Sequence, residues 1–293
     1  MPNAAVNGIE LAYEVHGPDD GEPLVLVMGL GSTLVSWDDE FVAGLVDRGF
    51  RVVRFDNRDV GLSTKLDRVQ TNMAEQIMRA MAGEAVDAPY DLSDMANDTA
   101  GLLDHLGIGS AHVVGASMGG MIAQTLAIEH PDRVRTLTSI MSTTGDLDVG
   151  QASAEAAAVL LQRPANDREG AIANALQTWR VIGSPDHFDP ERVRRRAGAA
   201  YDRGYHPAGV ARQLLAVAAS GSRTARLREV AVPTLVIHGE LDPLIGVSGG
   251  RRTAEAVPGA RLLVIEGMAH DLEPVFWSPI IEAITALAAG ANV

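Results

Sequence analysis

The sequence predicts an α/β fold in which a mainly parallel sheet carries helices on both faces and a helical cap interrupts the core. Two observations support this prediction. Short apolar runs alternate with segments of helical spacing along most of the chain, which is the pattern of strand–helix–strand units. The stretch 143–229 breaks the alternation, because it shows only helical patterns. We therefore expect a core formed by 1–142 and 230–293, with a cap (lid) insertion at 143–229.

The predicted strands differ in their patterns. Ile9–Val15 alternates apolar and polar residues and is expected to be half exposed. The others are short, nearly continuous apolar runs, which are typical of strands covered on both faces. They are Leu24–Met28, Phe50–Phe55, Ala111–Gly115, Val134–Met141, Pro233–His238 and Arg261–Ile265.

Helices are expected between these strands, and several end at glycine or proline, as helices commonly do. The helical segments are Trp37–Arg48, Asp98–Leu106, Met118–His130, Val247–Val257 and Pro274–Ala289. The segment 66–95, which includes Met73, Met78 and Met81, forms a second and smaller excursion from the core. We expect both excursions over the edge of the sheet where the strand C-termini meet.

The bulk composition disfavours several classes of function. A formal net charge of -14 argues against binding to nucleic acid or to an anionic membrane, because both need a basic face. The absence of cysteine excludes disulfides, thiolate metal sites and a cysteine nucleophile. The N-terminus lacks a secretory signal, and we find no apolar run of the roughly 18 to 20 residues that span a membrane. We expect a cytoplasmic protein without stable membrane insertion; the sequence offers no support for a homo-oligomer and no argument against one.

The central motif is Gly115-Ala116-Ser117-Met118-Gly119, which lies between a predicted strand and a predicted helix. A Gly-x-Ser-x-Gly sequence also arises by chance, but this context favours a nucleophile turn. The serine of such a turn has a strained backbone, so the residues two positions away must be small. The hydroxyl stands above the sheet, and the Met118 N–H at the helix N-terminus can stabilise an oxyanion. The sequence therefore predicts Ser117 as a nucleophile.

A serine hydroxyl needs a base to become a strong nucleophile, and the base needs an acid that orients it. His270 fits the base, because it follows the strand Arg261–Ile265 by a short loop and should reach the sheet edge that carries Ser117. His238, at the end of a strand, is the only other serious candidate. The remaining histidines are interpreted as structural or surface residues: His16, His105, His112, His130, His187 and His206.

Asp242 is the preferred acid. It lies just past a strand end, and the chain order Ser, Asp, His is the one that a nucleophile turn of this kind uses. Glu240 and Asp146 remain rivals, because each also follows a predicted strand. Asp271, next to His270, is expected to be solvated.

The turn Gly29-Leu30-Gly31 offers a second oxyanion donor, the Leu30 N–H, beside that of Met118. The flanking glycines let the backbone approach a ligand closely, although a simple strand-to-helix turn remains the alternative. Our hypothesis for the substrate pocket is an apolar cleft under the cap that includes Gly29 and Trp179; core packing explains Trp179 equally well. We expect no cofactor and no metal, because the histidines lack ligand spacing.

These residues resemble the α/β-hydrolase fold family over nearly the whole chain. The resemblance rests on three stretches together: Val113–Gly120, Ile237–Pro243 and Gly267–His270. A fourth, Phe55–Ser63, is similar to the family's Asp-x-Arg-Gly-x-Gly-x-Ser segment, with Asp59 in place of the usual glycine. That segment is chiefly structural in the family, so its acidic and basic side chains are expected to stabilise a loop.

Within this family, Val27–Gly31 and Ser36–Phe41 look most like the aclacinomycin methylesterase branch, which hydrolyses a methyl ester on a bulky polyketide. The resemblance implies a serine esterase that cleaves a hydrophobic small-molecule ester through an acyl-enzyme. It does not transfer the polyketide, because caps diverge. The alternatives on the same triad are a cofactor-free perhydrolase of the haloperoxidase kind, a lactonase and a thioesterase. A non-catalytic small-molecule receptor of this fold is the alternative outside enzymes.

Overall fold

The computed structural model describes residues 1–68, 72, 75, 76, 78, 79 and 82–291. Within them lies a sheet of eight strands in the order β1-β2-β4-β3-β5-β6-β7-β8. The β1–β2 and β2–β4 pairs are antiparallel, and the other neighbours are parallel. The prediction of a mainly parallel sheet is therefore confirmed. The strands are β1 (Asn3–Val6), β2 (Ile9–His16), β3 (Glu22–Val27), β4 (Phe50–Phe55), β5 (Ala111–Ala116), β6 (Val134–Ile140), β7 (Thr234–Gly239) and β8 (Arg261–Ile265).

The sequence analysis missed β1, although its signal was present. Asn7 and Gly8 connect β1 to β2, and both have positive φ values, 45° and 77°. Asn-Gly is the preferred sequence for a two-residue hairpin turn of this kind. The strand itself is short and contains Asn3, so its apolar pattern alone did not identify it.

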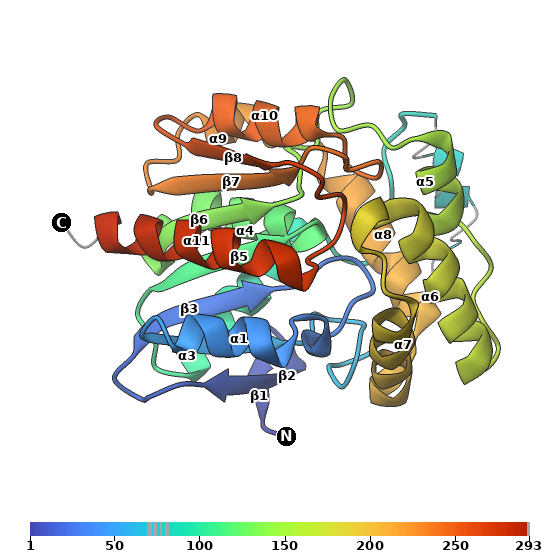
Figure 1. The fold of residues 1–293 in the computed structure, drawn as a ribbon, viewed down its shortest axis with the longest axis horizontal. Coiled ribbons are helices and arrows are strands. Elements are labelled where there is room, and N and C mark those ends of the chain that lie inside the picture. Colours follow the sequence, from blue (N-terminus) through green and yellow to red (C-terminus); the bar gives the residue numbers. More distant parts are fainter. Residues whose placement is uncertain (69–71, 73–74, 77, 80–81, 292–293) are drawn as a thin grey trace.

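Helices cover both faces of the sheet because each central strand is apolar on both sides. In β3, Val25 and Val27 pack with the helices of one face, whereas Leu24 and Leu26 pack with those of the other. The first face carries α3 (Leu92–His105), α4 (Met118–Glu129) and α10 (Val247–Ala256), and the second carries α1 (Asp39–Val46) and α11 (Trp277–Ala291). Figure 1 shows α1 and α11 in front of the strands, with α3 and α4 behind them.

Two helices differ from the expectation. The helix α3 begins at Leu92, six residues before the predicted start, because Asp91 and Asp94 form a reciprocal capping box there.

The stretch Pro274–Ala291 is long and apolar enough to span a membrane by length and composition. Our expectation that no apolar run reaches this length was wrong. Ile280 and Ile284 on α11 pack against the sheet, as in a core helix of a globular protein.

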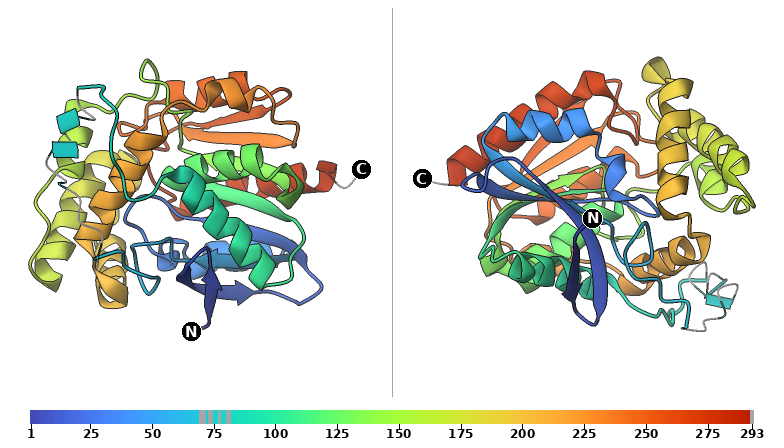
Figure 2. Two further views of the ribbon diagram at one scale, coloured as in Figure 1. Left: turned by 180° about the vertical axis from the view of Figure 1, so that it is seen from behind. Right: turned by 90° about the horizontal axis from the view of Figure 1, so that it is seen from below.

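The region between β6 and β7 contains only helices among its regular elements, as the sequence predicted. They are α5 (Ala154–Leu160), α6 (Arg168–Ile182), the 3₁₀ turn η3 (Pro185–His187), α7 (Pro190–Gly204), α8 (Pro207–Ser220) and α9 (Thr224–Leu227). Three further 3₁₀ turns lie in the core: η1 (Leu34–Ser36), η2 (Pro131–Arg133) and η4 (Pro274–Phe276). Helices α5 to α8, hereafter the cap, gather at the end toward which the β3 arrow points (Figures 1 and 2). The short α9 contacts α4 and α10 of the core.

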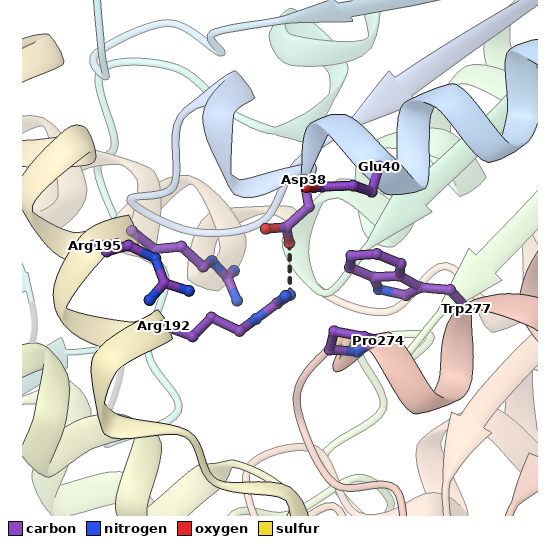
Figure 3. Close-up of a pocket in the computed structure, with 7 residues that line it drawn as sticks. Asp38, Glu40, Arg192, Arg195, Pro274 and Trp277 are labelled. Atoms are coloured by element: carbon purple, nitrogen blue, oxygen red, sulfur yellow. Dashed lines mark hydrogen bonds and ion pairs between the residues drawn. The ribbon is translucent and has the colours of Figure 1, made fainter.

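Partly buried ion pairs attach the cap to the core. Arg203 of α7 contacts Asp56 at 2.9 Å, and Arg192 of the same helix contacts Asp38 at 2.7 Å. The carboxylate of Asp56 also accepts the Leu34 and Leu62 N–H groups, which agrees with the loop-stabilising role expected for it. Beside the Arg192–Asp38 pair, a cavity of about 330 Å³ lies between α7, α1 and the start of α11 (Figure 3).

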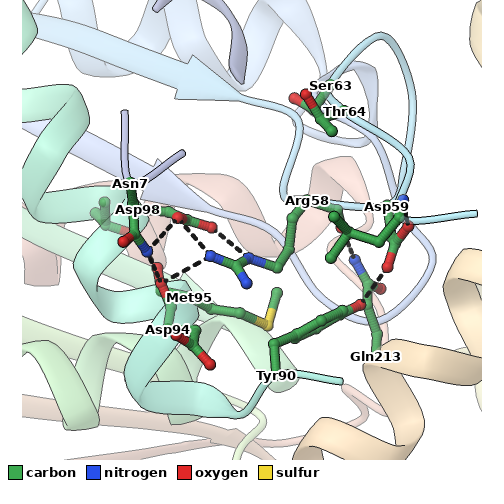
Figure 4. A network of polar contacts seen from close by, with 12 residues as sticks. Asn7, Arg58, Asp59, Ser63, Thr64, Tyr90, Asp94, Met95, Asp98 and Gln213 are labelled. Carbon is green, nitrogen blue, oxygen red and sulfur yellow. Dashed lines mark hydrogen bonds and ion pairs between the residues drawn. The ribbon is translucent and has the colours of Figure 1, made fainter. Parts of the chain in front are cut away.

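Asp59 forms a third ion pair between the core and the cap. This pair explains why aspartate stands here, where the family usually has glycine. Its backbone has a φ of +71°, a conformation that favours glycine, asparagine or aspartate. Its buried carboxylate accepts two hydrogen bonds from Arg212 of α8, at 2.7 and 2.9 Å. It accepts a third from the Tyr90 hydroxyl at 2.8 Å (Figure 4). Burial alone would raise the pKa of Asp59, but the bonds from Arg212, Leu66 and Tyr90 outweigh it and hold the pKa below its usual range.

We expect Asp59→Asn to lower the free energy of unfolding by about 3 kcal/mol, because it removes the buried counter-ion of Arg212. Only the exposed Asp67, at 3.2 Å, then remains to pair with the guanidinium. Asparagine keeps the side-chain shape and tolerates the left-handed backbone. Urea unfolding measures the change, with Asp202→Asn as the control, since the Arg168–Asp202 pair has the same two-bond geometry but is exposed. Equal losses in the two variants would show that the Arg212–Asp59 pair does not hold the cap.

Candidate active site

The turn between β5 and α4 places Ser117 in a strained backbone. Its φ is 55° and its ψ is -121°, which is costly for a residue with a side chain. The turn needs its two glycines: a Cβ on Gly115 would collide with the Gly119 carbonyl, and a Cβ on Gly119 would collide with the Val27 carbonyl. The Ser117 N–H donates to the Ile140 carbonyl at 2.9 Å. These constraints present the hydroxyl above the C-terminal ends of the strands.

The structure brings together the three residues predicted as a triad. Ser117 Oγ lies 3.0 Å from His270 Nε2, and His270 Nδ1 lies 2.7 Å from Asp242 Oδ2. Asp242 comes from the loop after β7, and His270 comes from the loop after β8. A carboxylate only accepts, so Nδ1 carries the ring hydrogen and Nε2 is free to accept the serine proton. The geometry is that of a serine nucleophile with its general base.

The environment of Asp242 favours its ionised form. The Oδ1 atom accepts the Leu244 and Ile245 N–H groups, each at 2.9 Å. Burial alone would raise the pKa of this carboxyl, but the charge of His270 and the hydrogen bonds from His238, His270 and Ile245 outweigh it. They hold the pKa well below its usual range. Asp242 is therefore a charged acceptor at every pH at which the protein is expected to function.

The rival candidates occupy other positions. His238 Nε2 donates to the Ile245 carbonyl at 2.7 Å and lies 3.5 Å from Asp242 Oδ2, so it supports the acid rather than facing the serine. Asp146 accepts from Ser222, Thr224 and Arg252. Glu240 is exposed. Among the described residues, no group of three or more His, Cys, Asp or Glu is arranged around a metal position.

The turn Gly29-Leu30-Gly31 lies against the nucleophile. A Cβ on Gly29 would lie 3.1 Å from the Ser117 Cβ and 3.6 Å from its Oγ, so only glycine permits this approach. Within the described part of the chain, neither the Leu30 N–H nor the Met118 N–H donates to a backbone or side-chain acceptor. Both remain available to a ligand, as an oxyanion hole formed by Leu30 and Met118 requires.

The loop that carries His270 is held by the segment after α6, which the sequence analysis did not foresee. The His270 N–H donates to the Ile182 carbonyl at 2.9 Å. Ser184 accepts the Ala269 N–H and donates its own N–H and hydroxyl to Asp271, each at 2.6 Å. Asp271 is only 4% exposed, so the expectation that it is solvated was wrong. Its position next to the base could have suggested a structural role, whereas nothing in the sequence points to Ser184.

The proposed pocket residues have different surroundings. Gly29 adjoins the nucleophile, as described above. Trp179 packs inside the cap beside Ala156 and Val159, and Arg196 stacks on its ring; its role in substrate binding stays a prediction. Of the methionines named above in the segment 66–95, Met78 is exposed, and Met73 and Met81 lie outside the described residues.

Comparison with known proteins shows which family the fold belongs to. Residues 22–272 match the family model described as the alpha/beta hydrolase fold. The chain is 30% identical to rhodomycin D methylesterase DnrP of Streptomyces peucetius, over the full length of both proteins. It is 27% identical to the putative non-heme bromoperoxidase BpoC of Mycobacterium tuberculosis, over 89% of this chain and 91% of that protein.

A solved structure is also similar over nearly its whole length. The enol-lactonase from Burkholderia xenovorans superimposes with a TM-score of 0.72 and 26% identity, covering 99% of each chain. Similarity of this kind shows a shared fold and does not by itself transfer a substrate.

Proposed function

Because the chain belongs to the α/β-hydrolase fold family, we propose that it is a serine esterase whose triad is Ser117, His270 and Asp242. One observation carries the proposal: the unbroken chain of hydrogen bonds from Ser117 Oγ through His270 to Asp242, at 3.0 and 2.7 Å. A serine paired with a correctly oriented imidazole has the arrangement that activates it as a nucleophile.

The proposed reaction is a two-step acyl transfer. Ser117 Oγ attacks the ester carbonyl while His270 Nε2 takes its proton, and the oxyanion accepts the Leu30 and Met118 N–H groups. The tetrahedral intermediate collapses with cleavage of the bond to the alcohol oxygen, which His270 protonates as it leaves. Water then attacks the acyl-enzyme by the same route and regenerates Ser117. Asp242 stabilises the imidazolium in both steps.

The substrate class is proposed as a hydrophobic small-molecule ester. The identity to a methylesterase over the full length supports an ester. The partly exposed apolar side chains of Leu30 and Val210, at the turn Gly29-Leu30-Gly31, support an apolar substrate. Lactones are the second candidate, supported by the 26% identity to an enol-lactonase over nearly the whole chain, because ring opening of a lactone uses the same attack on an ester carbonyl.

The test is hydrolysis of p-nitrophenyl esters from acetate to palmitate, with a γ-lactone and a methyl ester followed by pH-stat. We expect turnover of at least one series, and stoichiometric labelling of Ser117 by a fluorophosphonate, which needs an activated serine. Folded protein that neither turns over any ester nor reacts with the fluorophosphonate would overturn the proposal and favour the non-catalytic receptor.

A further inference from the structure

Gln213 of α8 connects the cap to the turn that carries the proposed oxyanion donor. Its side chain is completely buried, with 0% exposure. The Oε1 atom accepts the Gly31 N–H at 2.9 Å, and the Nε2 atom donates to the Arg58 carbonyl at 2.8 Å. Both ends of the amide are therefore used, and they join two core loops that are 27 residues apart in sequence, from Gly31 to Arg58. Figure 4 shows Gln213 reaching toward the loop of Arg58 and Asp59.

The helix that carries Gln213 is held firmly at this point. The preceding residue, Arg212, forms the buried pair with Asp59. One turn earlier, the methyl groups of Val210 lie within 3.1 Å of where a Cβ on Gly31 would be. The short stretch 210–213 of α8 therefore supplies an ion pair, an apolar contact and a hydrogen-bond acceptor to the core.

Few hydrogen bonds from core side chains hold the turn itself: the Ser32 hydroxyl donates to the Leu30 carbonyl at 3.4 Å, and Asn57 Nδ2 donates to the Met28 carbonyl at 2.9 Å. Glycines lie on both sides of Leu30, and Gly31 has a φ of +66°. The glycines let the turn approach Ser117 closely. They also leave its backbone free to adopt many conformations, because glycine is the least restricted residue. The Ser32 N–H bonds to the Gly29 carbonyl within the turn. The Gly31 N–H, by contrast, bonds to the cap, so the cap helps decide where the neighbouring Leu30 N–H lies.

We propose that Gln213 is a positioning residue for the oxyanion turn, through which the docked cap sets the place of the Leu30 N–H. This inference rests on the proposed function, since it assigns the Leu30 N–H to the oxyanion. A donor must lie within about 0.5 Å of its productive position to act in the transition state. The cap is then part of the catalytic framework as well as a cover over the substrate.

The first experiment compares Gln213→Leu with the wild type. Leucine removes both hydrogen bonds at similar volume. Removal of one oxyanion donor costs on the order of 10²–10³ in turnover, so a displaced donor is expected to cost about 10-fold to 100-fold. Rates are expressed per serine labelled by fluorophosphonate, which cancels any loss of folded protein. We expect kcat to fall while KM stays within about 3-fold of the wild-type value. A trifluoromethyl ketone forms an adduct with the serine that bears the oxyanion, so we expect its affinity to fall in proportion to kcat/KM.

Gln124→Leu is the matched control. Gln124 is also 0% exposed, and its amide bonds to Ser139 and Arg223, away from the oxyanion turn. We expect its kcat per labelled serine to equal that of the wild type. An unchanged kcat in Gln213→Leu, an equal fall in both variants, or an effect on KM alone would overturn the inference while leaving the esterase proposal intact. If the wild-type protein neither hydrolysed esters nor reacted with the fluorophosphonate, the esterase proposal itself would be wrong.

Gln213→Glu provides a test if the leucine variant does not fold. A protonated carboxyl can accept the Gly31 N–H and donate to the Arg58 carbonyl, whereas the ionised form cannot donate. Burial favours the protonated form. The neighbouring ionisable groups are the same in both proteins: Arg58 and Arg212, with their partners Asp98, Asp59, Asp67 and His206, and Tyr90, which bonds to Asp59. The ratio of variant to wild-type kcat therefore cancels their titration. We expect this ratio to approach one at low pH and to fall as pH rises; a flat ratio would contradict the positioning role.

Discussion

Ser117→Ala is expected to reduce ester turnover by on the order of 10⁶, the loss seen when the nucleophile of a comparable triad is removed. Alanine keeps the Cβ, so the strained backbone at φ 55° and the contact with Gly29 persist. Only the Oγ atom 3.0 Å from His270 Nε2 is lost. The variant keeps the oxyanion donors and still binds substrate, so it is expected to keep only a small residual rate above that in water.

The measurement is the initial rate on the best p-nitrophenyl ester, with fluorophosphonate labelling and thermal unfolding on the same sample. Ser93→Ala serves as the control, because Ser93 bonds to Glu129 at the start of α3, outside the candidate site. We expect the control to keep its rate and its labelling. A disabled triad keeps far less than about 1% of its activity. Activity of Ser117→Ala above about 1% of the wild type would therefore show that Ser117 is not the nucleophile.

Asp242→Asn is expected to lower kcat by about 10⁴, with little change in the fold. The asparagine amide can donate toward His270 Nδ1, where the carboxylate now accepts at 2.7 Å. The imidazole would then carry its hydrogen on Nε2 and could no longer take the proton of Ser117. The variant also loses the negative charge that stabilises the imidazolium formed in both steps of the reaction.

The control for this prediction is Asp146→Asn, because Asp146 was the rival acid in the sequence. Its carboxylate accepts from Arg252, Thr224 and Ser222 and has no contact with His270. These bonds lower its pKa to about 2, which marks it as a structural anion. We expect its kcat per labelled serine to match the wild type. A severe loss in Asp146→Asn with normal turnover in Asp242→Asn would reverse the assignment of the acid.

Much of the fold was predictable because its signals are local. The strand β8 (Arg261–Ile265) was predicted to the residue, and the apolar runs of β3, β4 and β5 were placed within two residues of their ends. The motif around Ser117 was predictable for the same reason, since the turn demands small residues at fixed positions beside one strand and one helix. The start of α3 was missed because its capping residues, Asp91 and Asp94, precede the apolar spacing.

The sequence by itself determined the residue types and their order along the chain: a serine in a glycine-framed turn, then an aspartate and a histidine after later strands. A parallel sheet brings such strand ends to one edge, so their proximity followed from the fold class. Only the tertiary structure shows that Asp242 rather than Asp146 contacts His270, that His270 rather than His238 faces Ser117, and that Asp271 is buried. It also decided that Gln213, Ser184 and Arg212 connect the cap to the core loops. These contacts join residues more than 80 positions apart, and no local periodicity encodes which side chains meet across such a distance.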